Sequence, residues 1–81
     1  MIDPSRKARL IWQCRRGMLE LDLLLAPLVM RHIDDLNDHE LDALERLLAM
    51  DDPDLYALMM FDVYSDDQEV VELVKRIAIK H

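Results

Sequence analysis

The chain has little glycine, cysteine and proline, and each shortage argues against a class of protein. A single glycine, Gly17, and three prolines leave few places for tight turns, so helices joined by short links are favoured over β-hairpins. One glycine also cannot build a glycine-rich phosphate-binding loop. Cys14 is the only cysteine, which excludes a disulfide within the chain and a paired-cysteine zinc site. We interpret it as a small buried hydrophobic residue of a helix.

The length and composition predict one folded domain. The chain has 81 residues, of which 52% are hydrophobic, and we expect a single helical domain over residues 1–81. The longest apolar run, Leu23–Met30, is shorter than the roughly 20 residues that a membrane span needs. The N-terminal residues have neither the apolar run of a signal peptide nor the composition of a transit peptide. We therefore expect a cytoplasmic protein that does not contact a membrane.

Charge is divided unevenly along the chain. Residues 1–16 carry five basic side chains and one acidic, a net charge of +4, whereas residues 17–81 carry five basic and sixteen acidic, a net charge of −11. The acidic body argues against nucleic acid as a partner, because phosphate binding needs a basic face. The basic start is either a solvated helix face or a local patch for an anionic partner or cofactor. Charge alone favours the simpler interpretation, the solvated face.

The spacing of apolar residues predicts an all-α fold, a compact bundle of about five helices with short loops. No stretch alternates apolar and polar residues for long enough to form a strand. Helix starts are marked by side chains that cap free backbone N–H groups and by prolines that suit the first turn. The expected helices run over Pro4–Arg15 and Leu19–Arg31, from a capping box of Asn37 and Glu40, over Asp52–Phe61, and from a capping box of Ser65 and Gln68.

The first two predicted helices differ in the pattern of their apolar residues. One stripe of the first helix consists of Ala8, Ile11, Trp12 and Arg15. Gly17 should end that helix, as the left-handed residue just past it. The second helix is apolar nearly all round, so we expect it to be central and buried on several sides. Pro27 lies inside it and predicts a kink or a break into two pieces.

The third and fifth helices each carry a single apolar stripe, which predicts the side that they bury. These stripes are Leu41, Leu44, Leu47 and Leu48 in the third helix and Val70, Leu73, Val74 and Ile77 in the fifth. The short fourth helix carries Leu55, Tyr56, Leu58 and Met59, and its exposed Met and Leu residues could equally belong to the core or to an interface.

The sequence contains no recognisable catalytic or metal-binding constellation. No serine has a histidine or aspartate placed to activate it as a nucleophile. Paired aspartates such as Asp34–Asp35 and Asp66–Asp67 lack the spacing and central glycine of a calcium loop, and they stand near helix starts, where carboxylates are expected anyway. His32 and His39 fall in different segments. We therefore predict no catalytic residue, no metal ligand and no enzyme activity.

One stretch, Arg15–Asp22, does not look like routine helix-bundle sequence, because it combines both charges with the only glycine at a junction of two helices. In one interpretation Gly17 is a turn, and Arg16 and Glu20 form a surface ion pair that contributes little. In the other, Gly17 lets a second backbone approach closely, and the flanking Arg16 and Glu20 make charge-assisted hydrogen bonds to a partner. Composition leaves both interpretations open.

A resemblance to a known family favours the second interpretation. The pattern Arg-Gly-x-x-Glu followed by Leu-Asp, together with Asp51–Leu55 further along, resembles the SdhE/YgfY family of flavinylation factors, also called FAD assembly factors of succinate dehydrogenase. The resemblance spans the chain and includes Arg9 and Trp12 of the first helix. The family often has Phe and then Trp after the second motif, whereas residues 56–58 are Tyr-Ala-Leu.

The resemblance implies a five-helix assembly chaperone that binds the flavoprotein subunit of succinate dehydrogenase, and in some bacteria that of fumarate reductase. Such factors promote covalent attachment of FAD to a histidine of that subunit, and the bond-forming chemistry belongs to the flavin and the partner. The factor itself would hold no FAD stably and would be a monomer. An alternative is an antitoxin-like or regulatory protein-binding module. A flavin carrier in its own right is disfavoured, because a dinucleotide fold and a glycine-rich loop are missing.

The family's motif falls on three residues of this sequence, Arg16, Gly17 and Glu20. The resemblance implies that Gly17 allows close docking and that Arg16 and Glu20 reach toward the flavin region of the partner. Asp52 and Asp54 would fix a helix start and line the same face. The predicted partner-binding residues are Arg16, Gly17, Glu20, Arg9, Arg15, Asp22, Asp52 and Asp54.

Overall fold

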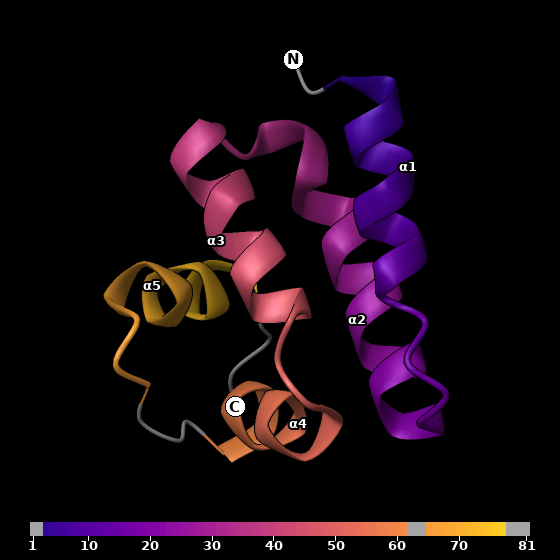
Figure 1. The fold of residues 1–81 in the computed structure, drawn as a ribbon, viewed down its shortest axis with the longest axis vertical. Coiled ribbons are helices and arrows are strands. Elements are labelled where there is room, and N and C mark those ends of the chain that lie inside the picture. The colour runs from indigo at the N-terminus through magenta and orange to yellow at the C-terminus, as the bar shows by residue number, and fades with distance from the viewer. Residues whose placement is uncertain (1–2, 62–64, 78–81) are drawn as a thin grey trace.

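The structure is a computed structural model that describes residues 3–61 and 65–77. Helices account for nearly all of the regular structure in this part, which contains no strand, and the predicted all-α class is confirmed (Figure 1). The elements are α1 (Pro4–Gln13), α2 (Leu19–His32), the 3-10 turn η1 (Ile33–Asp35), α3 (Asp38–Leu48), α4 (Asp52–Phe61) and α5 (Gln68–Ile77).

Helix α3 lies at the centre of the bundle. It packs against α5 on one side and against α1 on the other, and α2 contacts both α1 and α5 (Figure 1). Leu44 and Leu47 of α3 are completely buried, as are Leu21 and Leu25 of α2. Removing these side chains from water is the main force that holds the helices together. None of the helices in the described part of the chain has the length and apolar character that a membrane crossing requires.

The predicted capping box at the start of α3 is confirmed. The side chain of Asn37 accepts a hydrogen bond from the backbone N–H of Glu40 at 2.8 Å, and the Glu40 carboxylate accepts one from the Asn37 N–H at 2.9 Å. Two backbone donors that a helix start leaves free are thus satisfied. Asp3 caps α1 in a simpler way, since its carboxylate accepts from the Ser5 N–H.

The stripe predicted to be the apolar side of α1 is largely exposed. The helix buries Leu10 and Cys14 instead, whereas Trp12 is 71% exposed. Burial of Leu10 and Cys14, which lie four residues apart and so share a side, determines the rotation of α1 on its neighbours. Arg6, one turn before Leu10, forms ion pairs with Asp42 and Glu45 of α3 beside this buried side. The helix also ends at Gln13, two residues earlier than predicted.

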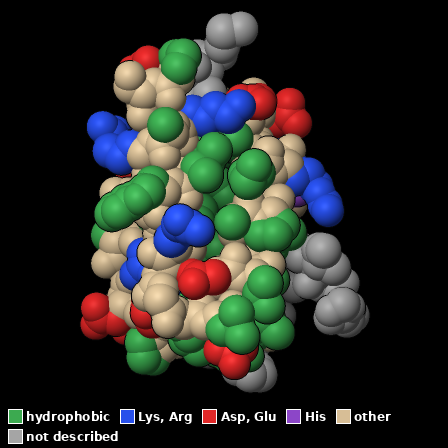
Figure 2. Space-filling view, turned by 90° about the vertical axis from the view of Figure 1, so that its right-hand side faces the viewer, with side chains coloured by type: hydrophobic (Ala, Val, Ile, Leu, Met, Phe, Trp, Pro, Cys, Tyr) green, Lys and Arg blue, Asp and Glu red, His purple; other side chains and the backbone are tan. Residues whose placement is uncertain are grey.

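A kink or a break into two pieces was predicted at Pro27; helix α2 is continuous through this residue, so the break does not occur. Its burial is one-sided rather than all-round. Leu21, Leu25, Leu28 and Val29 face the core, but Leu19 and Leu23 are 67% and 68% exposed and Met30 is 58% exposed. The expectation of a central helix buried on several sides is therefore wrong, because no other element of the described residues covers this side (Figure 2).

The start of α5 also differs from the prediction. The helix begins at Gln68 and is capped by Asp67, whose carboxylate accepts from the Val70 N–H at 3.3 Å, whereas the Ser65 hydroxyl accepts from the Asp67 N–H. Arg46 of α3 bonds the same carboxylate at 2.6 Å and is the main reason that the pKa of Asp67 lies below its ordinary value. The apolar stripes of α3 and α5 are buried as predicted.

Replacement of Asn37 by Ala should lower the free energy of unfolding by about 1 kcal/mol, because the Glu40 N–H loses its cap. Urea denaturation followed by circular dichroism measures this change. The exposed neighbour His39 is the control, and His39→Ala should shift the free energy of unfolding by less than about 0.5 kcal/mol. Equal effects of the two substitutions would contradict the cap.

Candidate docking site

The link between α1 and α2, residues 14–18, turns at Gly17. Its φ of +81° lies in the left-handed region, where side chains with a Cβ are strained, so the position favours glycine. The prediction that Gly17 ends α1 is wrong, because that helix has already stopped at Gln13. Gly17 instead reverses the loop into α2. The Asp22 carboxylate closes this loop by accepting from the Arg16 N–H at 2.6 Å.

The Arg16 side chain points inward and is only 15% exposed. Its Nε donates to Asp52 Oδ1 at 2.8 Å, Nη1 donates to the carbonyl oxygen of Leu48, and Nη2 donates to that of Met50. Leu48 is the last residue of α3, and the carbonyls at a helix end lack partners within the helix. A cation at this end also complements the helix dipole. Arg16 therefore caps α3 from outside that helix.

The same contacts join the two sequence motifs. Arg16 and Asp52 are far apart in the chain, and Asp52 is the first residue of α4. We name this set of contacts, made by Arg16 with Asp22, Asp52 and the carbonyls of Leu48 and Met50, the Arg16 clamp. The surface ion pair between Arg16 and Glu20 that the sequence allowed is not formed, since the guanidinium is used in the clamp.

The other predicted docking residues of this region face solvent. Arg15, Gly17, Glu20 and Asp54 are all exposed. A Cβ added at Gly17 would meet no atom within 4 Å, so the backbone there is open to an approaching molecule. The side chains of Arg15, Glu20 and Asp54 have no hydrogen bond or ion pair within residues 3–61 and 65–77. They remain predicted partner-binding residues, and their charges are available to a partner.

Arg9 lies apart from the clamp, on α1. It is 59% exposed and pairs with Glu45 at 3.4 Å, next to the shorter pair between Arg6 and Glu45 at 2.9 Å. Lys7 pairs with Asp34 in the same manner. Much of the basic start is thus matched to acidic side chains of this chain, and such exposed pairs each contribute little to stability.

Sequence reasoning missed an apolar groove between α2 and α4. The groove has a volume of about 330 Å³ and is lined by Glu20, Leu23, Leu24, Tyr56 and Met60. The sequence pattern places Leu23 in a helix that is buried on several sides, and it leaves the Met and Leu residues of the fourth helix open between core and interface. The all-round apolar character of α2 is itself a signal of such a groove. A helix of this length at the edge of a thin core cannot bury every side, so some of its apolar side chains must remain exposed.

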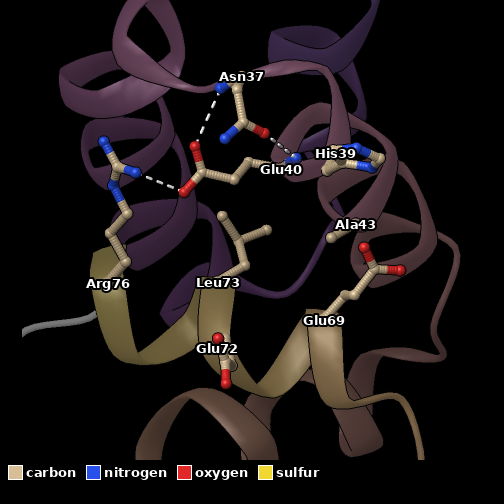
Figure 3. Close-up of a pocket in the computed structure, with 8 residues that line it drawn as sticks. All are labelled: Asn37, His39, Glu40, Ala43, Glu69, Glu72, Leu73 and Arg76. Carbon is tan, nitrogen blue, oxygen red and sulfur yellow. Dashed lines mark hydrogen bonds and ion pairs between the residues drawn. The ribbon is translucent and has the colours of Figure 1, made fainter.

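A second pocket, of about 420 Å³, lies between α3 and α5 (Figure 3). Its main polar groups already bond one another or their neighbours: Asn37 and Glu40 form the capping box, Arg76 pairs with Glu40, and Glu69 pairs with Arg46. We interpret it as a seam between packed helices. Within the described residues no three His, Cys, Asp or Glu side chains gather as they would around a metal ion.

Cys14 is completely buried, as predicted, and its thiol donates to the Leu10 carbonyl at 3.4 Å. Burial raises the pKa of the Cys14 thiol to about 11, and the positive charge of Arg16 opposes this only in part. A protonated thiol is a poor nucleophile and a poor metal ligand. The residue is therefore part of the core and contributes no reactive group to the site.

Comparison with known proteins decides the family. The sequence model of the Sdh5 family, described as the flavinator of succinate dehydrogenase, matches residues 8–81. This chain belongs to the Sdh5 family. The match includes the Arg16 clamp, Gly17 and both walls of the α2–α4 groove.

Relatives within this family are similar over nearly their whole length. The protein named FAD assembly factor SdhE of Legionella pneumophila (strain Paris) is 45% identical over 76 residues, which cover 94% of this chain and 95% of the relative. That of Yersinia pseudotuberculosis serotype I (strain IP32953) is also 45% identical over 76 residues, or 94% and 86%. A solution structure of a UPF0350 protein superposes with a TM-score of 0.76 at 39% identity, covering 95% of this chain and 82% of that one.

Replacement of Arg16 by Ala should lower the free energy of unfolding of this Sdh5-family chain by about 2 kcal/mol, since Asp52 and two backbone carbonyls lose their donor. Arg16→Lys keeps the charge but not the fork of donors, so it should fall between Arg16→Ala and the parent. Urea denaturation measures both. The matched control is Arg15→Ala, which should change the free energy by less than about 0.5 kcal/mol. A stability of Arg16→Ala equal to that of Arg15→Ala would show that the clamp is not formed.

The Cys14 thiol should resist iodoacetamide at pH 8 in the folded chain and react in urea, because folding buries it and raises its pKa. The folded chain also holds this proton more firmly than the unfolded chain. This difference in proton affinity stabilises the folded chain fully below pH 9. The stabilisation is lost as the pH rises from 9.0, the ordinary pKa of a cysteine thiol, toward about 11, the pKa of Cys14 in the folded chain. Mass spectrometry measures alkylation, and Cys14→Ala is the control that removes this part of the pH dependence. Rapid alkylation of the folded chain would contradict the burial.

Proposed function

We propose that this chain is an assembly factor that binds the flavoprotein subunit of succinate dehydrogenase and promotes covalent attachment of FAD to it. The observation that carries the proposal is the family match over residues 8–81, with relatives named FAD assembly factor at 45% identity. The flavoprotein subunit of fumarate reductase is a second client within the same proposal. Both clients would be met in the cytoplasm by a monomer of the factor.

The geometry supports a role in docking. The Arg16 clamp holds the loop of residues 14–18 against the start of α4, so the exposed backbone of Gly17 and the carboxylate of Glu20 are presented on a fixed support. A surface that is already ordered loses less conformational entropy when it binds. Hydrophobic side chains are scattered over the α1 and α2 side of the molecule, with single basic and acidic side chains between them (Figure 2). Such a mixed surface suits a protein partner.

The proposed mechanism is a shift in the conformation of the client. A factor that binds better to the FAD-competent form of the flavoprotein raises the population of that form, in proportion to its difference in affinity for the two forms. The flavin and the client supply the reacting groups, so the factor needs no catalytic residue and no stably bound FAD.

A gene deletion tests the function directly. In the source organism, removal of this chain should abolish the covalent flavin fluorescence of the succinate dehydrogenase flavoprotein in a denaturing gel, and the tagged chain should capture that flavoprotein from a lysate. Undiminished flavin fluorescence after deletion would overturn the proposal. Capture of a small basic protein instead would favour the antitoxin-like alternative.

Two substitutions at Gly17 distinguish the effect of a bulky side chain on binding from the effect of backbone strain. Gly17→Arg should abolish binding to the flavoprotein while the bundle stays folded, because the added side chain meets open space in the free chain and would block a backbone that docks there. Gly17→Asn is the control, since Asn tolerates a left-handed backbone and is small. It should retain most of the binding. Isothermal titration calorimetry with the flavoprotein subunit measures both, and normal binding by Gly17→Arg would remove the docking role of Gly17.

A further inference from the structure

The groove between α2 and α4 adjoins the proposed docking loop, and no side chain of residues 3–61 or 65–77 fills it. One wall comes from the first two turns of α2 through Glu20, Leu23 and Leu24, and the other from α4 through Tyr56 and Met60. Residues four apart on a helix share a side, so each wall is a short ridge and the groove runs between two ridges. The inference below rests on the proposed function.

The floor and rim of the groove are apolar side chains that remain in contact with water. Leu23 is 68% exposed and Met60 is 49% exposed, whereas Leu24 and Tyr56 are half-buried. Large apolar side chains that share an exposed hollow favour a partner that removes them from water. Leu24 and Tyr56 also pack against the core of the isolated chain, whereas Leu23 and Met60 stand exposed beside them.

Glu20 adds a charge to the apolar groove. Its carboxylate is exposed and has no hydrogen bond or ion pair with the residues that the structure describes. Its place in the first turn of α2 suits the helix dipole, which accounts for an acidic residue there but not for apolar neighbours from a second helix. A carboxylate at the rim of an apolar hollow is complementary to an apolar side chain that has a cation beside it.

The Arg16 clamp fixes both walls of the groove. The backbone N–H of Arg16 is bonded to Asp22 in α2, and its guanidinium is bonded to Asp52 in α4. The two ridges are therefore held at a set separation before any partner arrives. A groove of this kind selects a side chain by its shape, because it does not have to be ordered during binding.

We propose that the α2–α4 groove receives one apolar side chain of the flavoprotein subunit, and that a lysine or arginine next to that side chain in the client pairs with Glu20. The groove begins three residues after Gly17, so a client segment that approaches the open backbone at Gly17 continues directly along it. The loop at Gly17 allows the client backbone to approach closely, and the groove recognises the side chains of the same client segment.

The test compares two apolar residues of the same helix that are both more than half exposed. Leu23 lies in the groove, whereas Met30 lies outside it, about 10 Å further along α2 at 1.5 Å per residue. Binding to the FAD-free flavoprotein subunit is measured by isothermal titration calorimetry, and circular dichroism confirms that each variant is folded. Leu23→Asp should weaken binding about tenfold or more, as loss of an interface anchor does. Met30→Asp should bind within about twofold of the parent, as a residue outside the contact does.

Glu20 is tested by charge. Glu20→Gln should weaken binding and flatten its dependence on salt concentration, and Glu20→Lys should weaken it further by repelling the cation of the client. Equal affinities of the Glu20→Gln and Glu20→Lys variants and the parent would overturn the ion pair. Equal affinities of Leu23→Asp and Met30→Asp, with a parent that binds, would overturn the groove and leave the proposed function standing.

Two further outcomes concern the occupant. If the parent chain itself does not bind the flavoprotein subunit, the proposed function fails and the groove does not have this occupant. If the parent forms dimers in sedimentation velocity experiments and Leu23→Asp is a monomer, a second copy of this chain fills the groove, and the proposal is overturned.

Discussion

The structure depends on one guanidinium group that meets the ends of three helices. Arg16 donates to the carbonyl of Gln13, the last residue of α1, to that of Leu48, the last of α3, and to the carboxylate of Asp52, the first of α4. Helix ends are where backbone groups lack partners, and a small bundle has many ends for its size. A single guanidinium satisfies several at once, because its five donors spread over a planar fork, whereas the three donors of a lysine share one nitrogen. The guanidinium thereby fastens two links of the chain, residues 14–18 and residues 49–51, to the helix ends beside them.

The two parts of the Arg-Gly-x-x-Glu motif therefore have opposite orientations. Arg16 is directed into the protein and positions the loop, whereas Gly17 and Glu20 are directed outward and are open to a partner. A residue can belong to a functional motif without touching the partner, if it fixes the geometry of those that do. Loss of function on changing Arg16 would accordingly be accompanied by a loss of stability, so client binding and the free energy of unfolding must be measured for the same variants.

Much of the fold could be predicted from the sequence, because helix starts and apolar spacing are local. The capping box of Asn37 and Glu40 and the buried stripe of α3 needed no information from elsewhere in the chain. The rotation of α1 could not be predicted, since the local spacing offers Ile11 and Trp12 as an apolar side and only the packing against other helices selects Leu10. The Arg16 clamp was hidden for a related reason: two of its acceptors are backbone carbonyls, which leave no trace in the sequence. The exposed side of α2 was missed because apolar residues at an interface and in a core look alike.

The exposure of Trp12 has a consequence for how this protein can be observed. It is the only tryptophan, it lies near the end of α1, and its carbonyl is bonded to the N–H of Arg15 in the following loop. Its indole already faces water in the folded state, so its emission should change little when the bundle melts and should be quenched readily by iodide. Tryptophan fluorescence of this chain should therefore report poorly on unfolding, but it should respond to a molecule that covers the surface around Trp12.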